Sequence, residues 1–167
     1  AMAELRRFYP VPFEVEAFTL DMGHADGYPG MDFSPIAALC ERLEVPYHVV
    51  PSEIARIIFD VRKETNPCSL CAKLRRGALN NAAKELGCNT VALGHHFDDA
   101  VETFLMNLLL EGRIGCFQPV TYLDRTDVTQ LRPMLYAEER EVQNAVNRLG
   151  LPVVVNTSPA DGSTHRE

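Results

Sequence analysis

Two short stretches of the chain contain the residue types that most often do chemistry. In PCSLCAKLRRG, residues 67–77, two cysteines separated by two residues precede a lysine and two arginines. In GHHFDD, residues 94–99, two histidines precede two aspartates. Thiolates bind zinc and iron, whereas imidazole and carboxylate groups suit acid–base chemistry or a magnesium–phosphate complex. The pattern therefore indicates a metal site, a nucleotide site or both.

The spacing of Cys68 and Cys71 lets both thiolates reach one zinc or iron atom. This pair supplies only two ligands, whereas a structural zinc site needs four and a catalytic iron–sulfur cluster can use three. Instead of binding a metal, the two cysteines could simply pack at the start of a helix or could do redox chemistry. The redox alternative is the weaker one, because a thioredoxin-like motif begins a helix directly after the first strand of its own fold.

Positive charge is concentrated around the two cysteines. Between Arg62 and Lys84 there are six basic residues and one acidic residue, although the whole chain carries a net charge of -7. The acidic balance argues against a protein that coats nucleic acid over its whole surface, but it allows a local basic patch. The candidates for phosphate binding are therefore Lys73, Arg75 and Arg76. Alternatively, these side chains only form a solvated helix face.

GHHFDD follows the apolar run NTVAL and precedes a helical pattern, so it lies at a strand-to-helix junction. Gly94 permits a tight turn there, and Asp98 is the expected N-cap of the helix. A helix N-terminus can hold a phosphate group, and Asp98 with Asp99 could bind Mg²⁺ if phosphate supplied further oxygen ligands. Alternatively, Asp98 only caps the helix and the histidines make only local hydrogen bonds.

Alternating strand and helix patterns must position these stretches. Strand patterns occupy residues 11–20, 45–50, 89–94 and 152–156, with an edge or short strand at 129–134. Helical patterns occupy residues 34–43, a short segment from 52, and 69–86, 98–110 and 138–150. This order predicts an α/β fold with a doubly wound parallel sheet. Since such sheets bind ligands beyond the carboxyl ends of their strands, the loops at 20–23, 94–99 and 156–162 should line one site.

The whole chain of 167 residues, 46% of them apolar, fits a single domain over residues 1–167. We find neither a secretory signal nor an apolar run long enough to span a membrane, so we expect a soluble, cytoplasmic protein. Five cysteines are an odd number and argue against a disulfide framework. Cys40, Cys88 and Cys116 read as ordinary core or loop cysteines.

Three segments, in their order along the chain, resemble the tRNA 2-thiocytidine synthetase family of the PP-loop (N-type ATP pyrophosphatase) superfamily. They are PCSLCAKLRRGAL, CNTVALGHHFDDAVETFLMNLLLEG and QLRPMLYAEEREV. The resemblance covers nearly the whole chain from Phe8 onward. The pattern GHHxxDxxET is shared with tRNA lysidine synthetases and identifies the superfamily, whereas CSLCxxLRRG before it identifies the branch.

The resemblance implies an adenine-nucleotide α-hydrolase-like (Rossmann-like) fold that uses ATP and Mg²⁺ to adenylate a tRNA cytidine and then replaces its oxygen with sulfur. In the family, the target is the cytidine at position 32 of the anticodon loop. A [4Fe-4S] cluster held by three cysteines handles the sulfur, for which a cysteine desulfurase or sulfide is the expected donor. Adenylation makes AMP the leaving group, while Mg²⁺ and cations stabilise the departing pyrophosphate. The sequence leaves a homodimer open.

The resemblance also implies a role for individual residues, each matched by its motif. The implied metal ligands are Cys68 and Cys71; the catalytic residues are His95, Asp98 and Asp99; the ATP-binding residues are Leu20, Asp21, Met22, Gly94, His95 and His96; and the predicted RNA contacts are Lys73, Arg75 and Arg76.

Two positions depart from the family pattern. The phosphate-binding loop SGGKDS, expected between a first strand and a first helix, is absent, and AMAELRRFYP resembles the tail of that helix. We therefore expect a fragment that lacks the first strand and the phosphate loop. Ser158 stands where the family has its third cysteine ligand, and a serine hydroxyl is a poor ligand for iron. Either the cluster does not assemble, or another ligand or zinc takes its place.

Two other functions stay open at this point. One is a different PP-loop reaction, such as lysidine-type ligation, which gives no reason for CSLC ahead of the GHH motif. The other is a binding domain without catalytic activity, which the missing SGGKDS loop and Ser158 favour.

Overall fold

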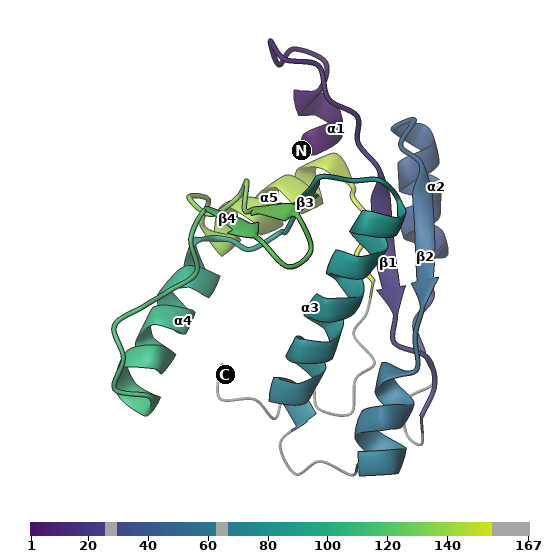
Figure 1. Ribbon diagram of the computed structural model, residues 1–167. Coiled ribbons are helices and arrows are strands. Elements are labelled where there is room, and N and C mark those ends of the chain that lie inside the picture. Colours follow the sequence, from purple (N-terminus) through teal and green to yellow (C-terminus); the bar gives the residue numbers. More distant parts are fainter. Residues whose placement is uncertain (26–29, 63–66, 155–167) are drawn as a thin grey trace. The chain divides into compact units, whose positions relative to one another are not determined.

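The computed structural model describes residues 1–25, 30–62 and 67–154, without the side chains of Pro67 and Cys68 (Figure 1). The described residues form two compact units, one of residues 1–78 and 151–154 and the other of Leu79–Gly150. In chain order the elements are α1 (Met2–Leu5), β1 (Ala17–Asp21), α2 (Ser34–Arg42), β2 (Tyr47–Pro51), η1 (Arg56–Arg62), α3 (Pro67–Glu85), β3 (Thr90–Ala92), α4 (Phe97–Leu110), β4 (Val120–Leu123), β5 (Val128–Leu131) and α5 (Glu139–Leu149).

The first unit contains a parallel strand pair with a helical crossover. Strands β1 and β2 pair in register from Ala17 opposite Tyr47 to Asp21 opposite Pro51, and α2 connects them (Figure 1). This is the βαβ arrangement that the alternating pattern predicts. The strand predicted over residues 11–20 is partly wrong, because β1 begins only at Ala17. The length of β1 is set by its pairing with β2, in which Tyr47 is the first paired residue and lies opposite Ala17.

The LDMG turn at the carboxyl end of β1 is closed by hydrogen bonds. The Gly23 amide donates to Asp21 Oδ1 at 3.0 Å, and the Ser52 hydroxyl donates to the Asp21 carbonyl at 2.7 Å. Gly23 has φ +77°, and a Cβ atom there would lie 2.5 Å from the Ser52 carbonyl oxygen. Only glycine meets both conditions without strain.

Replacing Gly23 with alanine should therefore destabilise the protein by more than the same change at Gly87. Gly87 has a similar φ of +75°, but a Cβ atom there would meet nothing within 4 Å. Backbone strain alone predicts a loss of about 1–2 kcal/mol for Gly87→Ala, whereas Gly23→Ala adds a steric clash. Urea-induced unfolding measures both changes, and equal losses would contradict the close approach to Ser52.

The segment before the CSLC motif forms an unusual helix. We predicted a short helix from Ser52, and the structure has a π-helix, η1, whose Ile58 is buried. The long helix α3 begins at Pro67, close to the predicted start at residue 69, and ends at Glu85. Proline suits the first turn of a helix because its missing N–H would have no partner there.

The second unit contains a three-stranded sheet in the order β3-β5-β4. Strand β3 is parallel to β5, and β4 is antiparallel to β5 across the tight turn 124–127. Both strands of the parallel pair were predicted, but β5, expected as an edge or short strand, is the central strand of this sheet. Strand β4 was not predicted, because its four residues are too few for a clear pattern. Residues 152–156 were predicted as a last strand. Positions 152–154 form no strand, and 155–156 lie outside the described residues.

A buried amide pair fastens the end of α3 to the central strand of this sheet. Asn80 on α3 and Gln130 on β5 are both buried, and Gln130 Nε2 donates to Asn80 Oδ1 at 3.0 Å. We expected the apolar run at 89–94 to be a buried strand, but on β3 only Val91 is buried. The physical reason is that β3 lies at the edge of the sheet within the described part of the chain.

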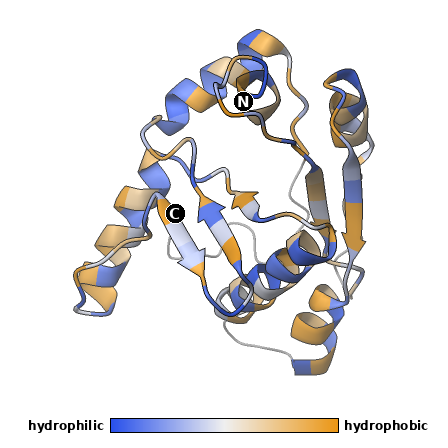
Figure 2. Ribbon diagram, turned by 45° about the horizontal axis from the view of Figure 1, so that its top comes forward, coloured by the Kyte–Doolittle hydropathy of each residue, from blue (hydrophilic) through white to orange (hydrophobic). Residues whose placement is uncertain are grey.

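Helix α4 is apolar but has no fully buried residue. Figure 2 shows mostly hydrophobic residues along it. Val101, Phe104, Leu105 and Leu108 follow the spacing of one helix face, and each is at least 38% exposed. An exposed stripe of this kind commonly marks an interaction surface. Among the residues described, no helix is both long and apolar enough to cross a membrane.

Candidate functional site

The GHHFDD stretch lies where the sequence predicted it, between β3 and α4. The Leu93 amide donates to the Leu131 carbonyl at 2.8 Å, which extends the pairing of β3 with β5 by one residue. Gly94 and His95 then leave the sheet, and α4 begins at Phe97. The motif therefore occupies the carboxyl end of a parallel strand, where sheets of this class bind ligands.

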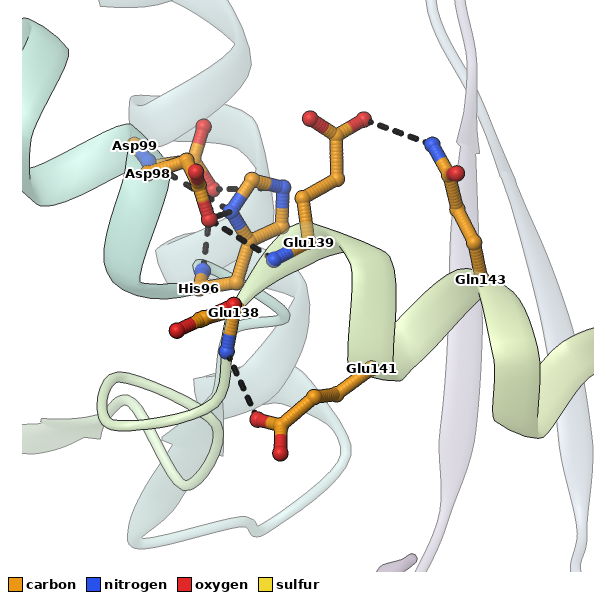
Figure 3. Close-up of polar contacts among 7 residues, drawn as sticks. All are labelled: His96, Asp98, Asp99, Glu138, Glu139, Glu141 and Gln143. Carbon is orange, nitrogen blue, oxygen red and sulfur yellow. Dashed lines mark hydrogen bonds and ion pairs between the residues drawn. The ribbon is translucent and has the colours of Figure 1, made fainter.

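His96, not Asp98, is the N-cap of α4, so the predicted cap is wrong by two residues. The His96 amide donates to Asp99 Oδ2 at 2.9 Å, and the Asp99 amide donates to His96 Nδ1 at 3.4 Å (Figure 3). This reciprocal pair is a capping box in which histidine takes the usual place of serine or threonine. His96 has an extended backbone, φ -109° and ψ -176°, which places the helix start one residue later.

Asp98 reaches a neighbouring helix instead. Its Oδ2 accepts a hydrogen bond of 2.7 Å from the backbone amide of Glu139, the first residue of α5 (Figure 3). The Phe97 amide also donates to the Ala137 carbonyl at 2.9 Å. The starts of α4 and α5 are thus joined at two consecutive residues of α4. Sequence reasoning missed this junction, although the acidic start of the predicted helix at 138–150 was visible.

His95 contacts an aromatic residue that sequence reasoning also missed. The imidazole and the Phe117 ring have centroids 4.9 Å apart, and the Arg132 guanidinium lies 4.7 Å from the centroid of the same Phe117 ring. Arg132 follows β5, the strand next to β3, and its Nη1 donates to the Gln118 carbonyl at 2.6 Å. Phe117 therefore links two residues that leave neighbouring parallel strands, and the arginine contact is of the cation–π type.

The CSLC motif occupies the first turns of α3. Cys68 and Cys71 are three residues apart on this helix, a spacing that places two positions on one helix face. Cys71 is half-buried, and the side chain of Cys68 lies outside the described part. Lys73, Arg75 and Arg76 follow on the same helix and are exposed. Their roles in metal and RNA binding stay predictions.

Two of the other cysteines have clear structural places. Cys40 is buried in an apolar cluster with Ala3 and Val45, and burial raises the pKa of its thiol, which disfavours the thiolate. The Cys116 thiol donates to the Ala100 carbonyl at 3.3 Å. Within residues 1–25, 30–62 and 67–154, no three His, Cys, Asp or Glu side chains are grouped to hold a metal ion. Ser158 lies outside those ranges.

The predicted ATP-binding residues are divided between the two units. Leu20, buried, and the half-buried Asp21 and Met22 belong to the first unit, whereas the GHHFDD residues belong to the second. The third predicted segment, residues 156–162, lies outside the described residues. A single site formed by all three segments stays a prediction.

Comparison with known proteins identifies relatives along the whole chain. A family model described as PP-loop domain matches residues 30–167. Over 164 residues the chain is 37% identical to a tRNA-cytidine(32) 2-sulfurtransferase of Pelobacter propionicus, covering 98% of this chain and 60% of that protein. It is 38% identical over 160 residues to the Geobacter sulfurreducens protein of the same name, covering 95% and 61%. The chain thus spans about 60% of the length of these curated relatives.

A solved structure shares the fold. It is a U34-tRNA thiolase from Methanococcus maripaludis, determined with its [4Fe-4S] cluster. The TM-score is 0.67 at 24% sequence identity, and the match covers 90% of this chain and 52% of that one. The predicted α/β fold of the adenine-nucleotide α-hydrolase type is therefore confirmed.

Proposed function

Because the chain belongs to the PP-loop domain family, we propose that it forms the ATP-binding domain of an enzyme that adenylates and then thiolates a cytidine of tRNA, at position 32 of the anticodon loop. One observation carries this proposal. The branch-specific CSLCxxLRRG motif lies at the start of α3, and GHHFDD follows at the carboxyl end of β3. The Pelobacter propionicus and Geobacter sulfurreducens relatives are both named for this activity.

In this reaction the cytidine oxygen attacks the α-phosphorus of ATP, pyrophosphate leaves, and a sulfur nucleophile then displaces AMP. His95 and Asp99 would face the nucleotide at the strand-to-helix junction, where Mg²⁺ would be bound mainly by phosphate oxygens. Leu20 and Met22 would contact the adenine and ribose, and Asp21 would shape their turn through the Gly23 amide. ATP and tRNA are the substrates, the cytoplasm is the expected location, and a cysteine desulfurase or sulfide is the expected sulfur donor.

We further propose that tight ATP binding requires the SGGKDS loop of the PP-loop superfamily. The chain spans about 60% of the length of its relatives, and SGGKDS does not occur in it.

The residues present do not fit a three-thiolate iron–sulfur cluster. Cys68 and Cys71 supply two soft ligands, but Ser158 supplies a hard hydroxyl in place of the third. Cys40 is buried in its own core cluster, and its raised thiol pKa makes it a poor substitute. Zinc bound by the two cysteines with other ligands is the alternative.

Replacing both Arg75 and Arg76 with alanine should weaken tRNA binding and lower its salt dependence. Each lost phosphate contact should reduce the slope of log K against log salt by about 0.7–0.9. Filter binding or fluorescence anisotropy at several salt concentrations measures this. The double variant Arg140→Ala/Arg148→Ala is the matched control, since both arginines are exposed on α5 and this change also removes two positive charges. An equal effect of the control would mean that only net charge matters.

The proposed function is tested by mass spectrometry of tRNA nucleosides from a strain that lacks the gene. We expect loss of 2-thiocytidine and its recovery when the gene is restored. Loss of lysidine instead would support ligation, and an unchanged nucleoside profile would support a binding domain without catalytic activity.

A further inference from the structure

We propose that Asp98 is a positioning residue, whose carboxylate joins the start of α4 to the start of α5 and so holds the GHHFDD turn in place. The sequence motif alone assigned Asp98 to catalysis. The inference rests on the proposed function only in that this turn is taken as the nucleotide site.

The hydrogen bond from the Glu139 amide to Asp98 Oδ2 fills a specific need of α5. The first N–H groups of a helix have no partner within the helix, and Glu139 is the first residue of α5. A carboxylate there is favoured both by the hydrogen bond and by the positive end of the helix dipole. Asp98 therefore caps the neighbouring helix, 41 residues away in sequence, and not its own.

Further bonds make this contact part of a junction. The Phe97 amide donates to the Ala137 carbonyl, and two residues earlier than His95 the Leu93 amide donates to the Leu131 carbonyl. Along the chain, His95 thus lies between hydrogen bonds that join the β3–α4 segment to the β5–α5 segment. The Asp98–Glu139 bond is the second bond, after Phe97–Ala137, between the starts of α4 and α5. Loss of the Asp98 carboxylate would leave only the Phe97–Ala137 bond there.

The two acids of the motif differ in their hydrogen bonds. Asp99 exchanges hydrogen bonds with His96 inside the α4 capping box, whereas Asp98 Oδ2 accepts one from the Glu139 amide of α5 and also lies 3.7 Å from His96 Nδ1. Positioning requires only an acceptor oxygen at residue 98. A role as magnesium ligand or proton carrier requires a carboxylate. Asparagine keeps the acceptor and lacks the charge, so Asp98→Asn separates the two roles.

The first test compares Asp98→Asn and Asp98→Ala by amide hydrogen exchange of this chain. In Asp98→Ala the Glu139 amide should exchange at least tenfold faster than in the wild type, while Asp98→Asn should stay within about threefold, because its amide oxygen still accepts the bond. Equal acceleration in both variants would contradict positioning by an acceptor oxygen.

A double-mutant cycle provides a second test, which also serves if one single variant folds poorly. Glu139→Pro removes the N–H that Asp98 accepts, and proline is favourable as the first helix residue. Glu138 already has φ -70° and ψ 149°, as a residue before proline requires. Asp98→Ala should lower the urea midpoint in the wild type and hardly at all in the Glu139→Pro background. The same drop in both backgrounds would overturn the contact.

Activity is read as 2-thiocytidine in a deletion strain that carries the gene with each variant. The Asp98→Asn gene should restore most of the 2-thiocytidine that Asp98→Ala loses. If both variants lack 2-thiocytidine while the Glu139 amide of Asp98→Asn stays protected, Asp98 is a catalytic or metal-binding residue and the proposal is wrong. If the unaltered gene restores none, the proposed function fails, and the exchange experiment still decides the role of Asp98.

Discussion

Replacing Ser158 with cysteine should raise the iron bound after anaerobic reconstitution to about four atoms per chain, the content of a [4Fe-4S] cluster. The unaltered chain should stay far below this, because two thiolates and a hydroxyl do not meet the preference of iron for soft sulfur ligands. Iron and sulfide analysis with the visible absorption spectrum of the cluster measures the difference. This is the largest gain that we expect from one substitution in the chain.

The ligand assignment has its own controls. Cys71→Ser in the Ser158→Cys background should abolish the gain, because it again leaves two thiolates. Cys116→Ser in that background should not, since the Cys116 thiol is engaged by the Ala100 carbonyl. A full cluster in the unaltered chain would mean that another residue serves as third ligand. If Ser158→Cys bound no more iron than the unaltered chain, the family's set of three cysteine ligands would not apply to this protein.

The chain should bind MgATP at least a hundredfold more weakly than a version extended at its N-terminus to contain SGGKDS. In such a loop, backbone N–H groups and the lysine donate charge-assisted hydrogen bonds to phosphate, each worth about 1.5–3 kcal/mol. Two of these account for a hundredfold change, because 1.4 kcal/mol corresponds to a factor of ten. Isothermal titration calorimetry on both versions measures it.

Adenosine is the control ligand, since it lacks the phosphates that the loop would bind. Both versions should bind adenosine with similar affinity, and alanine in place of the loop lysine should remove most of the gain for MgATP. Tight MgATP binding by the shorter chain would show that the phosphate loop is not required and would favour a phosphate site built from residues present here.

Local signals account for what could be predicted of the fold. The periodicity of α3, α4 and α5 located these helices to within two residues, and Gly150, with φ +58°, ends α5 where glycine was expected to end it. The strands were harder to predict. Strand β1 is shorter than its pattern and β4 has no clear pattern, because the length of a strand depends on the partner with which it pairs.

Of the site, the sequence by itself determined which residue types are present and that GHHFDD lies between a strand and a helix. It also determined that Ser158 stands in place of a third thiol. Only the tertiary structure decided the partner of each side chain. Asp98 binds Glu139 on another helix, and Phe117 lies between His95 and Arg132, because the parallel pairing of β3 with β5 brings distant segments to one edge of the sheet. Spacing along the chain carries no information about such contacts, since they depend on how the strands pair.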